Sequence, residues 1–313
     1  MHVIDLHCDT IHELLKNKKG SNLYKNDLSI DIEKMKQGGS LAQFFALYIN
    51  LEETNDPLDT CLKMLDKFYI ELEKNKKYVS LATNYTDIIK NNLENKISAF
   101  ITIEGGEALN GGLYNLRNFH RLGVRLITLT WNFPNEIGFP NCKEEYTNKG
   151  LTNFGIELVE ELNRLSMLID VSHLSDKGFY DVAKFSKKPF IASHSNSRTI
   201  TNHPRNLTDD MIKVLSEAGG VIGINFEESF LGTKSPGRIS DMVKHTKHIK
   251  NIGGVEVISL GSDFDGIDIP SEIENMAQIR KLIDELKKNN FSEEDIERIF
   301  YKNALRIIKD VLS

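Results

Sequence analysis

The stretch Val3-Ile4-Asp5-Leu6-His7-Cys8-Asp9-Thr10, at the start of the chain, is a short and mostly apolar run that leads directly into a histidine and an aspartate. Because side chains alternate along an extended strand, His7 and Asp9 share one face and Cys8 points to the other. Apolar strands that end in chemically useful side chains are typical of parallel α/β proteins, whose sites form at the carboxyl ends of the strands. The rest of the chain repeats this arrangement.

Seven more apolar or β-branched runs follow, and longer charged segments with helical periodicity separate them. The predicted strands are Val3–Leu6, Gln43–Ile49, Ile97–Ile103, Val124–Thr130, Met167–Val171, Pro189–Ser193, Gly220–Phe226 and Val257–Gly261. Helices are predicted over Leu58–Lys74, Tyr114–Arg121, Gly155–Leu165, Thr208–Ala218 and Arg238–Asn251, and a capped closing helix over Phe291–Ser313. Eight such units predict an α/β fold, a TIM-like (β/α)8 barrel, although an open doubly wound sheet uses the same elements. The polar side chains at the strand ends favour the barrel.

The composition is that of an ordinary soluble globular protein. The chain has 313 residues, 40% of them hydrophobic, with 39 basic and 45 acidic residues and hence a net charge of −6. No basic stripe is present, so we expect no nucleic acid partner. No apolar run approaches the ~20 residues that span a bilayer, and the first residues lack a secretion signal. With three widely separated cysteines, these features predict a cytoplasmic protein without membrane association, and a single domain over residues 1–313.

Side chains of the metal-ligating types stand at the ends of four predicted strands. They are His7, Asp9, Glu104, His173 and His194. Each has an ordinary alternative on its own, since a core histidine can bond to the backbone and a strand-end glutamate can turn into solvent. Together they point to a metal centre, because five such residues at one end of a barrel would otherwise have to arise independently. Nitrogen and oxygen ligands in this number suit two zinc ions, with Co²⁺ or Mn²⁺ as possible substitutes.

The last predicted strand adds a carboxylate at the same rim, in the run Gly261-Ser262-Asp263-Phe264-Asp265-Gly266. Asp263 could act as a base beside the metals, taking a proton from an activated water and returning it to the leaving group. The competing interpretation is an aspartate that fixes the loop, a role that also suits Asp265 before Gly266.

The motifs occur in a fixed order, His7-x-Asp9, Glu104-Gly105-Gly106, Asp170-Val171-Ser172-His173, Ser193-His194-Ser195, Arg205-Asn206 and Gly261-Ser262-Asp263-Phe264-Asp265-Gly266. With this set the whole chain resembles the membrane (renal) dipeptidase family, zinc-dependent peptidases of the amidohydrolase type, and in particular its cytosolic bacterial-type members. The resemblance implies a metal-dependent dipeptidase on a TIM-like barrel. It leaves open a D-residue at the C-terminal position of the substrate.

The resemblance also implies a division of the ligands. His7 and Asp9 would hold one zinc, His173 and His194 would hold the other, and Glu104 would bridge the two ions. A hydroxide shared by two zinc ions would be the nucleophile, and the same ions would polarise the peptide carbonyl.

Two further roles follow from the resemblance. Arg205 would bind the substrate carboxylate, for which its planar fork is well suited, and Asp263 would lie against the scissile group. Such a carboxylate clamp favours a short dipeptide over a long chain. The family resemblance also suggests a homodimer, for which the sequence itself offers no interface.

The segment Trp131-Asn132 departs from the renal members of the family, which carry a histidine at the position of Trp131. Either Asn132, a metal ion or the backbone takes over the substrate contact, or the preferred substrate differs. Trp131 could equally be a packing residue at the mouth of the site. This departure keeps an alternative open, a binuclear hydrolase acting on another amide or a lactone, whereas a non-enzymatic scaffold is disfavoured by the full set of ligands.

Overall fold

The computed structural model describes residues 1–16, 21–232, 236–267 and 271–312. In this part of the chain nine parallel strands alternate with helices. The strands are β1 Val3–Asp5, β2 Ser40–Tyr48, β3 Val79–Leu81, β4 Ile97–Glu104, β5 Val124–Thr128, β6 Leu168–Asp170, β7 Ile191–Ala192, β8 Val221–Ile224 and β9 Ile258–Leu260. Each of the eight predicted strands is present, at most a few residues shorter or longer than predicted.

Eight of these strands close into a barrel. Their order is β2-β1-β9-β8-β7-β6-β5-β4, and β4 pairs back to β2 through a register that runs from Ala42–Ser98 to Tyr48–Glu104. The short β3 was not predicted, and it pairs only with the first residues of β4. The predicted (β/α)8 barrel is therefore confirmed, and the open sheet is excluded.

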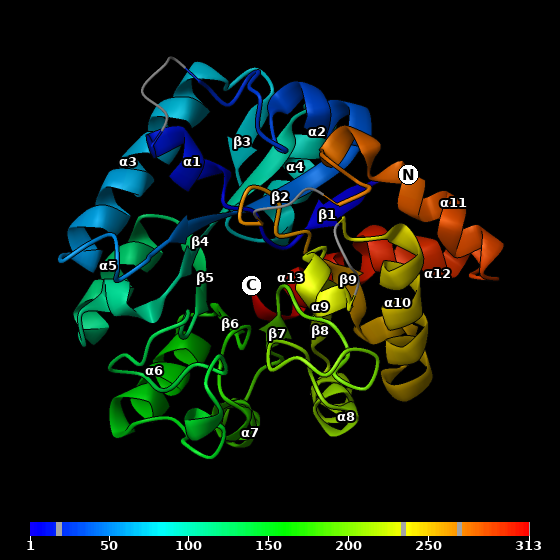
Figure 1. The fold of residues 1–313 in the computed structure, drawn as a ribbon. Coiled ribbons are helices and arrows are strands. Elements are labelled where there is room, and N and C mark those ends of the chain that lie inside the picture. The colour runs from blue at the N-terminus through cyan, green and yellow to red at the C-terminus, as the bar shows by residue number, and fades with distance from the viewer. Residues whose placement is uncertain (17–20, 233–235, 268–270, 313) are drawn as a thin grey trace.

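Helices surround the strands on the outside of the barrel (Figure 1). They are α1 Thr10–Lys16, α2 Ile32–Gly38, α3 Pro57–Lys74, α4 Tyr85–Leu93, α5 Leu113–Arg121, α6 Asn153–Arg164, α7 Asp176–Phe185, α8 Asp209–Glu217, α9 Glu228–Leu231, α10 Ile239–Gly253, α11 Arg280–Lys288, α12 Glu293–Glu297 and α13 Asn303–Val311. Local capping explains several boundaries. Asp56, for example, accepts from the backbone of Asp59 and is followed by Pro57 in the first turn of α3.

The closing segment is more broken than predicted. A capping box of Ser292 and Asp295 starts α12, but a π-helical turn over Arg298–Lys302 separates it from α13. Residue Ser313, the last of the predicted helix, lies outside the described residues. Side chains of α13 and side chains of the barrel strands belong to one buried apolar cluster. In this cluster Phe44 of β2 stacks on Phe100 of β4, with 4.5 Å between the ring centroids. The amino-terminal mouth of the barrel is thus filled, and the polar chemistry is left to the carboxyl ends of the strands.

Candidate metal centre

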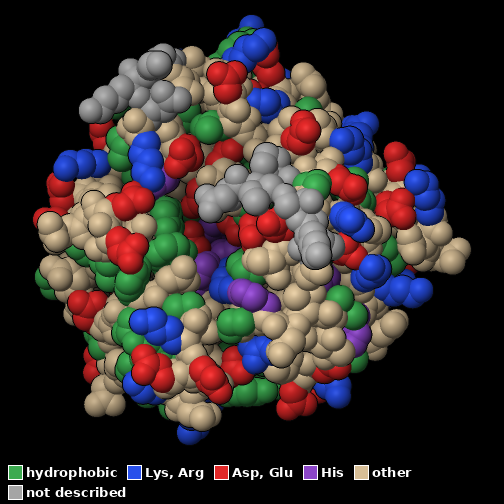
Figure 2. Space-filling view, in the orientation of Figure 1, with side chains coloured by type: hydrophobic (Ala, Val, Ile, Leu, Met, Phe, Trp, Pro, Cys, Tyr) green, Lys and Arg blue, Asp and Glu red, His purple; other side chains and the backbone are tan. Residues whose placement is uncertain are grey.

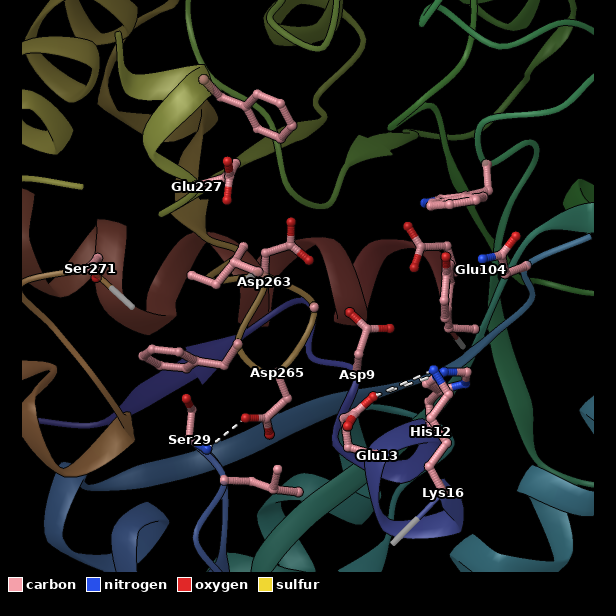
Figure 3. Close-up of a pocket in the computed structure, with 18 of the residues that line it drawn as sticks. Asp9, His12, Glu13, Lys16, Ser29, Glu104, Glu227, Asp263, Asp265 and Ser271 are labelled. Atoms are coloured by element: carbon pink, nitrogen blue, oxygen red, sulfur yellow. Dashed lines mark hydrogen bonds and ion pairs between the residues drawn. The ribbon is translucent and has the colours of Figure 1, made fainter. Parts of the chain in front are cut away.

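Four strands deliver the five predicted ligands to one place at the carboxyl end of the barrel. His7 and Asp9 follow β1, Glu104 is the last residue of β4, His173 follows β6 and His194 follows β7. All five side chains are buried. Because β1 and β6 stand on opposite sides of the ring, only the closed barrel brings their loops together. In Figure 3, the carboxylates of Asp9, Glu104 and Asp263 point toward the same part of the cavity.

Glu104 lies at the centre of the group, and its two oxygens face different partners. Oε1 is 3.0 Å from Nε2 of His173 and 3.3 Å from Nε2 of His194. Oε2 is 3.3 Å from Nε2 of His7, which in turn is 3.3 Å from Oδ2 of Asp9. Among the described residues the ligand atoms form three compact groups, two of which share Glu104, an arrangement that would suit a pair of bridged metal ions; the third joins His7, His194 and Asp263.

Two buried atoms of this cluster make no well-directed hydrogen bond among the described residues: Oδ1 of Asp9, and Nε2 of His7 despite its two carboxylate neighbours at 3.3 Å. A buried polar atom without a partner costs on the order of 1–3 kcal/mol, and more when it belongs to a charged group. A bound cation would satisfy both atoms, so the residues present fit a metal centre.

The electrostatics of Glu104, His173 and His194 agree with this assignment, whereas Glu104 and Asp9 overcome the effect of burial to raise the pKa of His7, and burial raises the pKa of Asp9 to about 7. Burial opposes ionisation of Glu104, but the charge of His7 outweighs it and the pKa of Glu104 lies well below its usual range. Burial, reinforced by Arg205, lowers the pKa of His173 to about 3. Burial also lowers the pKa of His194. At neutral pH the glutamate is an anion and these two histidines are neutral, which are the states that bind a divalent metal.

The loop after β5 fixes His173. Nδ1 of His173 lies 3.2 Å from Oδ1 of Asn132, and the backbone N–H of Asn141 donates to the His173 carbonyl at 2.7 Å. His173 itself has a left-handed backbone with φ 66°, a conformation that non-glycine residues adopt only when their surroundings hold them there. Asn132, expected to contact substrate, is therefore placed where it orients the ring of the candidate ligand His173, and it also lines the cavity.

Asp263 has a partner that the sequence analysis did not identify. Asn225, directly after β8, donates through Nδ2 to Oδ2 of Asp263 at 2.8 Å. The other oxygen, Oδ1, lies 3.7 Å from Nε2 of His7 and so faces the ligand cluster. Asp265 instead accepts from Thr10 Oγ1 and from the backbone N–H of Ser29, both at 2.6 Å, which is the loop-fixing role considered for it.

Arg205 is brought to the same cavity by the loop after β7. Its side chain is only 4% exposed, and Nη2 donates to the backbone carbonyl of His194 at 3.3 Å. Nε and Nη1 have no hydrogen-bond partner within the described ranges, and the guanidinium carbon lies 5.2 Å from the ring centroid of Phe230. Arg205 lines the cavity, and a buried guanidinium there is suited to an anion.

The cavity above the ligands has a volume of about 760 Å³. Figure 2 shows the hollow at the centre of this face, where histidine and acidic side chains gather. Trp131 lies on its wall with its ring 4.9 Å from that of Tyr48, edge to face. Trp131 thus packs against a neighbour and also borders the space that a substrate would fill.

This fold and this cluster define a class, a metal-dependent hydrolase built at the carboxyl end of a (β/α)8 barrel. Comparison with known proteins identifies the family: the model of the membrane dipeptidase family, peptidase family M19, matches residues 1–313, and the chain belongs to it. It is therefore a metallodipeptidase of that family, a hydrolase, as the resemblance predicted, and the family implies a metal, typically zinc.

Individual relatives agree with the family. The chain is 33% identical over 304 residues to an uncharacterized dipeptidase of Schizosaccharomyces pombe, which covers 89% of this chain and 71% of the relative. A metallopeptidase from Rhodobacter sphaeroides, solved with a phosphinate mimic of the dipeptide L-Ala-D-Ala, is 27% identical, with a TM-score of 0.92 over 99% of both chains. The solved dipeptidase AC of family M19 is 28% identical, with a TM-score of 0.91 over 100% of this chain and 99% of its own. Despite the family name, no helix in the described part of the chain has the length and apolarity to cross a membrane.

Proposed function

We propose that the protein hydrolyses the peptide bond of dipeptides at a centre of two zinc ions bridged by Glu104. The observation that carries this proposal is the placement of the Glu104 oxygens, one facing His173 and His194 and the other facing His7. Zinc bound there would supply a water activated near neutral pH and would polarise the scissile carbonyl.

In this proposal Asp263 moves the proton. Its Oδ1 atom faces the ligand cluster, and Asn225 holds the other oxygen, so the carboxylate is oriented for one task. It would accept the proton of the attacking water and return it to the amine that leaves.

Arg205 would recognise the free carboxylate of the second substrate residue. Arg205 lines the cavity with a buried guanidinium that can donate to a carboxylate there, and Tyr48, which ends β2, stands on the strand opposite β7 in the ring. A substrate that spans from the arginine across the metals toward Tyr48 and Trp131 is short. This geometry favours dipeptides over longer peptides.

A D-residue at the C-terminal position belongs to the same proposal. The supporting observation is the phosphinate mimic of L-Ala-D-Ala bound by the Rhodobacter sphaeroides metallopeptidase, whose chain matches this one along nearly its whole length. Asn132 and Trp131 both border the cavity and would shape the space around the substrate side chains.

The test is hydrolysis of L,L and L,D dipeptides by zinc-reconstituted protein, alongside N-acyl amides and lactones. Faster turnover of dipeptides supports the proposal, and a D-residue preference appears as a higher kcat/KM for the L,D member of a matched pair. Faster turnover of a lactone or another amide would select the alternative hydrolase instead.

A further inference from the structure

Beneath the ligand cluster lie two buried aspartate–serine pairs with matching geometry. Asp170 of β6 accepts from the backbone N–H of Ser193 at 2.8 Å through Oδ1 and from its hydroxyl at 2.6 Å through Oδ2. Asp5 of β1 accepts from the backbone N–H and hydroxyl of Ser262 at the same two distances. Each pair joins neighbouring strands of the barrel, and all four side chains are buried.

The two pairs differ in what the serine touches next. Oγ of Ser193 lies 2.7 Å from Nδ1 of His194 and 3.3 Å from Oγ of Ser172, whereas the hydroxyl of Ser262 meets only backbone groups beyond Asp5, the N–H of Phe264 and the carbonyl of His7. Only the Asp170 pair therefore reaches the ring of a proposed metal ligand.

Hydrogen-bond counting then fixes the tautomer of His194. A serine hydroxyl has one proton to donate, and Asp170, which is also bonded by the hydroxyl of Thr128 at 2.6 Å, accepts that proton. Ser193 Oγ must accept from His194, so the imidazole carries its proton on Nδ1. The Nε2 lone pair is then directed at Oε1 of Glu104, where the ligand atoms meet.

We infer that Asp170 and Ser193 are positioning residues for the metal centre, acting through His194 by a carboxylate–hydroxyl–imidazole relay. The relay holds His194 in the one tautomer that can bind a metal and raises the basicity of its Nε2 atom. Asp5 and Ser262 form the same buried bonds without reaching a ligand ring, and they only brace the strands. This inference rests on the proposed function, because it assigns the relay to that metal centre.

Asp170→Asn is the discriminating variant, because its amide can face only one way. Oδ1 of Asp170 accepts two backbone N–H groups, from Ser172 and Ser193, so the amide oxygen must take that place and the NH₂ must face Ser193. Ser193 then accepts from the amide and gives its proton to Nδ1 of His194, which moves the ring proton to Nε2 and blocks the ligand atom.

The experiment measures zinc affinity by competition with a chromogenic chelator, together with the visible spectrum of Co²⁺-loaded protein. For Asp170→Asn we expect one of the two ions to bind about 10–100-fold more weakly, with a changed Co²⁺ spectrum. The matched control Asp5→Asn should lie within about threefold of the wild type for both ions. Ser193→Ala and Ser262→Ala repeat the comparison should Asp170→Asn fail to fold.

If Asp170→Asn and Asp5→Asn bind zinc with equal affinity, or lose the same amount of affinity, the relay is overturned even if the wild type binds two metals and cleaves dipeptides. The same holds for Ser193→Ala and Ser262→Ala. A wild type that binds no metal would overturn the proposed centre and the relay with it. If the wild type hydrolyses dipeptides and only the Asp170 or Ser193 variant loses metal affinity, the result supports both the proposed centre and the relay.

Discussion

Arg205 offers the sharpest test of substrate recognition, because its guanidinium is buried in the cavity wall. A hydrogen bond to a charged partner contributes about 1.5–3 kcal/mol, so the loss of two such bonds in Arg205→Ala should cost at least ~3 kcal/mol of substrate binding. At 1.36 kcal/mol per factor of ten, that corresponds to a decrease of about 10²-fold in kcat/KM, mostly through KM.

The assay compares a dipeptide with its C-terminal amide, which lacks the charge that Arg205 is proposed to bind. Wild-type protein should prefer the free acid, and Arg205→Ala should lose that preference because the amide never made the contact. Arg205→Lys, which keeps the charge but not the planar fork, should recover only part of it. An equal loss for acid and amide in Arg205→Ala would refute the clamp and assign the arginine to structure alone.

Three other changes test the centre and its surroundings. Asp263→Asn should keep both metals and lose turnover by roughly 10²-fold or more, measured as kcat beside metal content, and unchanged kcat would remove it from proton transfer. Gly266→Ala should lose metal and activity, because a Cβ there would lie 2.2 Å from Oδ2 of Asp9 and 2.8 Å from Oδ1 of Asp263; full metal content by elemental analysis would contradict this. Glu107 is buried in the turn Gly106–Leu109 that follows β4, and burial raises its pKa from 4.5 to about 7, so the stability from its protonated form is present below pH 4.5 and is lost as the pH rises through 7. Between pH 5 and 8 the unfolding free energy of the wild type, measured by urea denaturation, should therefore fall by on the order of 3 kcal/mol relative to that of Glu107→Gln. Parallel pH profiles of the two proteins would contradict the raised pKa of Glu107.

The barrel could be predicted from the sequence because its strands are buried on both faces and so appear as nearly continuous apolar runs. Helix positions followed from the same pattern and from caps, and Leu58–Lys74 differs from α3 by one residue. The strand β3 was missed because three residues, Val79–Leu81, carry too little periodicity to distinguish them from a loop.

The five predicted ligands meet in the structure because each stands at a strand end, a position that sequence reveals. Their supporting residues could not be found in this way. Asn225 falls inside an apolar run, and its bond to Asp263 depends on the pairing of β8 with β9. The contact of Asn132 with His173 joins residues 41 positions apart through a loop without regular structure. Such hydrogen bonds depend on strand register and loop path, which a single sequence does not specify.

The central claim is that Glu104 bridges two metal ions at which dipeptides are cleaved. The most direct measurement is zinc content per chain after stripping, reconstitution and dialysis, for the wild type and for Glu104→Gln, with dipeptide hydrolysis followed on the same samples. The account predicts about two zinc ions per chain and turnover for the wild type, and loss of both tight binding and turnover for Glu104→Gln. Zinc-free wild type, or a Glu104→Gln variant that keeps two tightly bound ions and full activity, would contradict it.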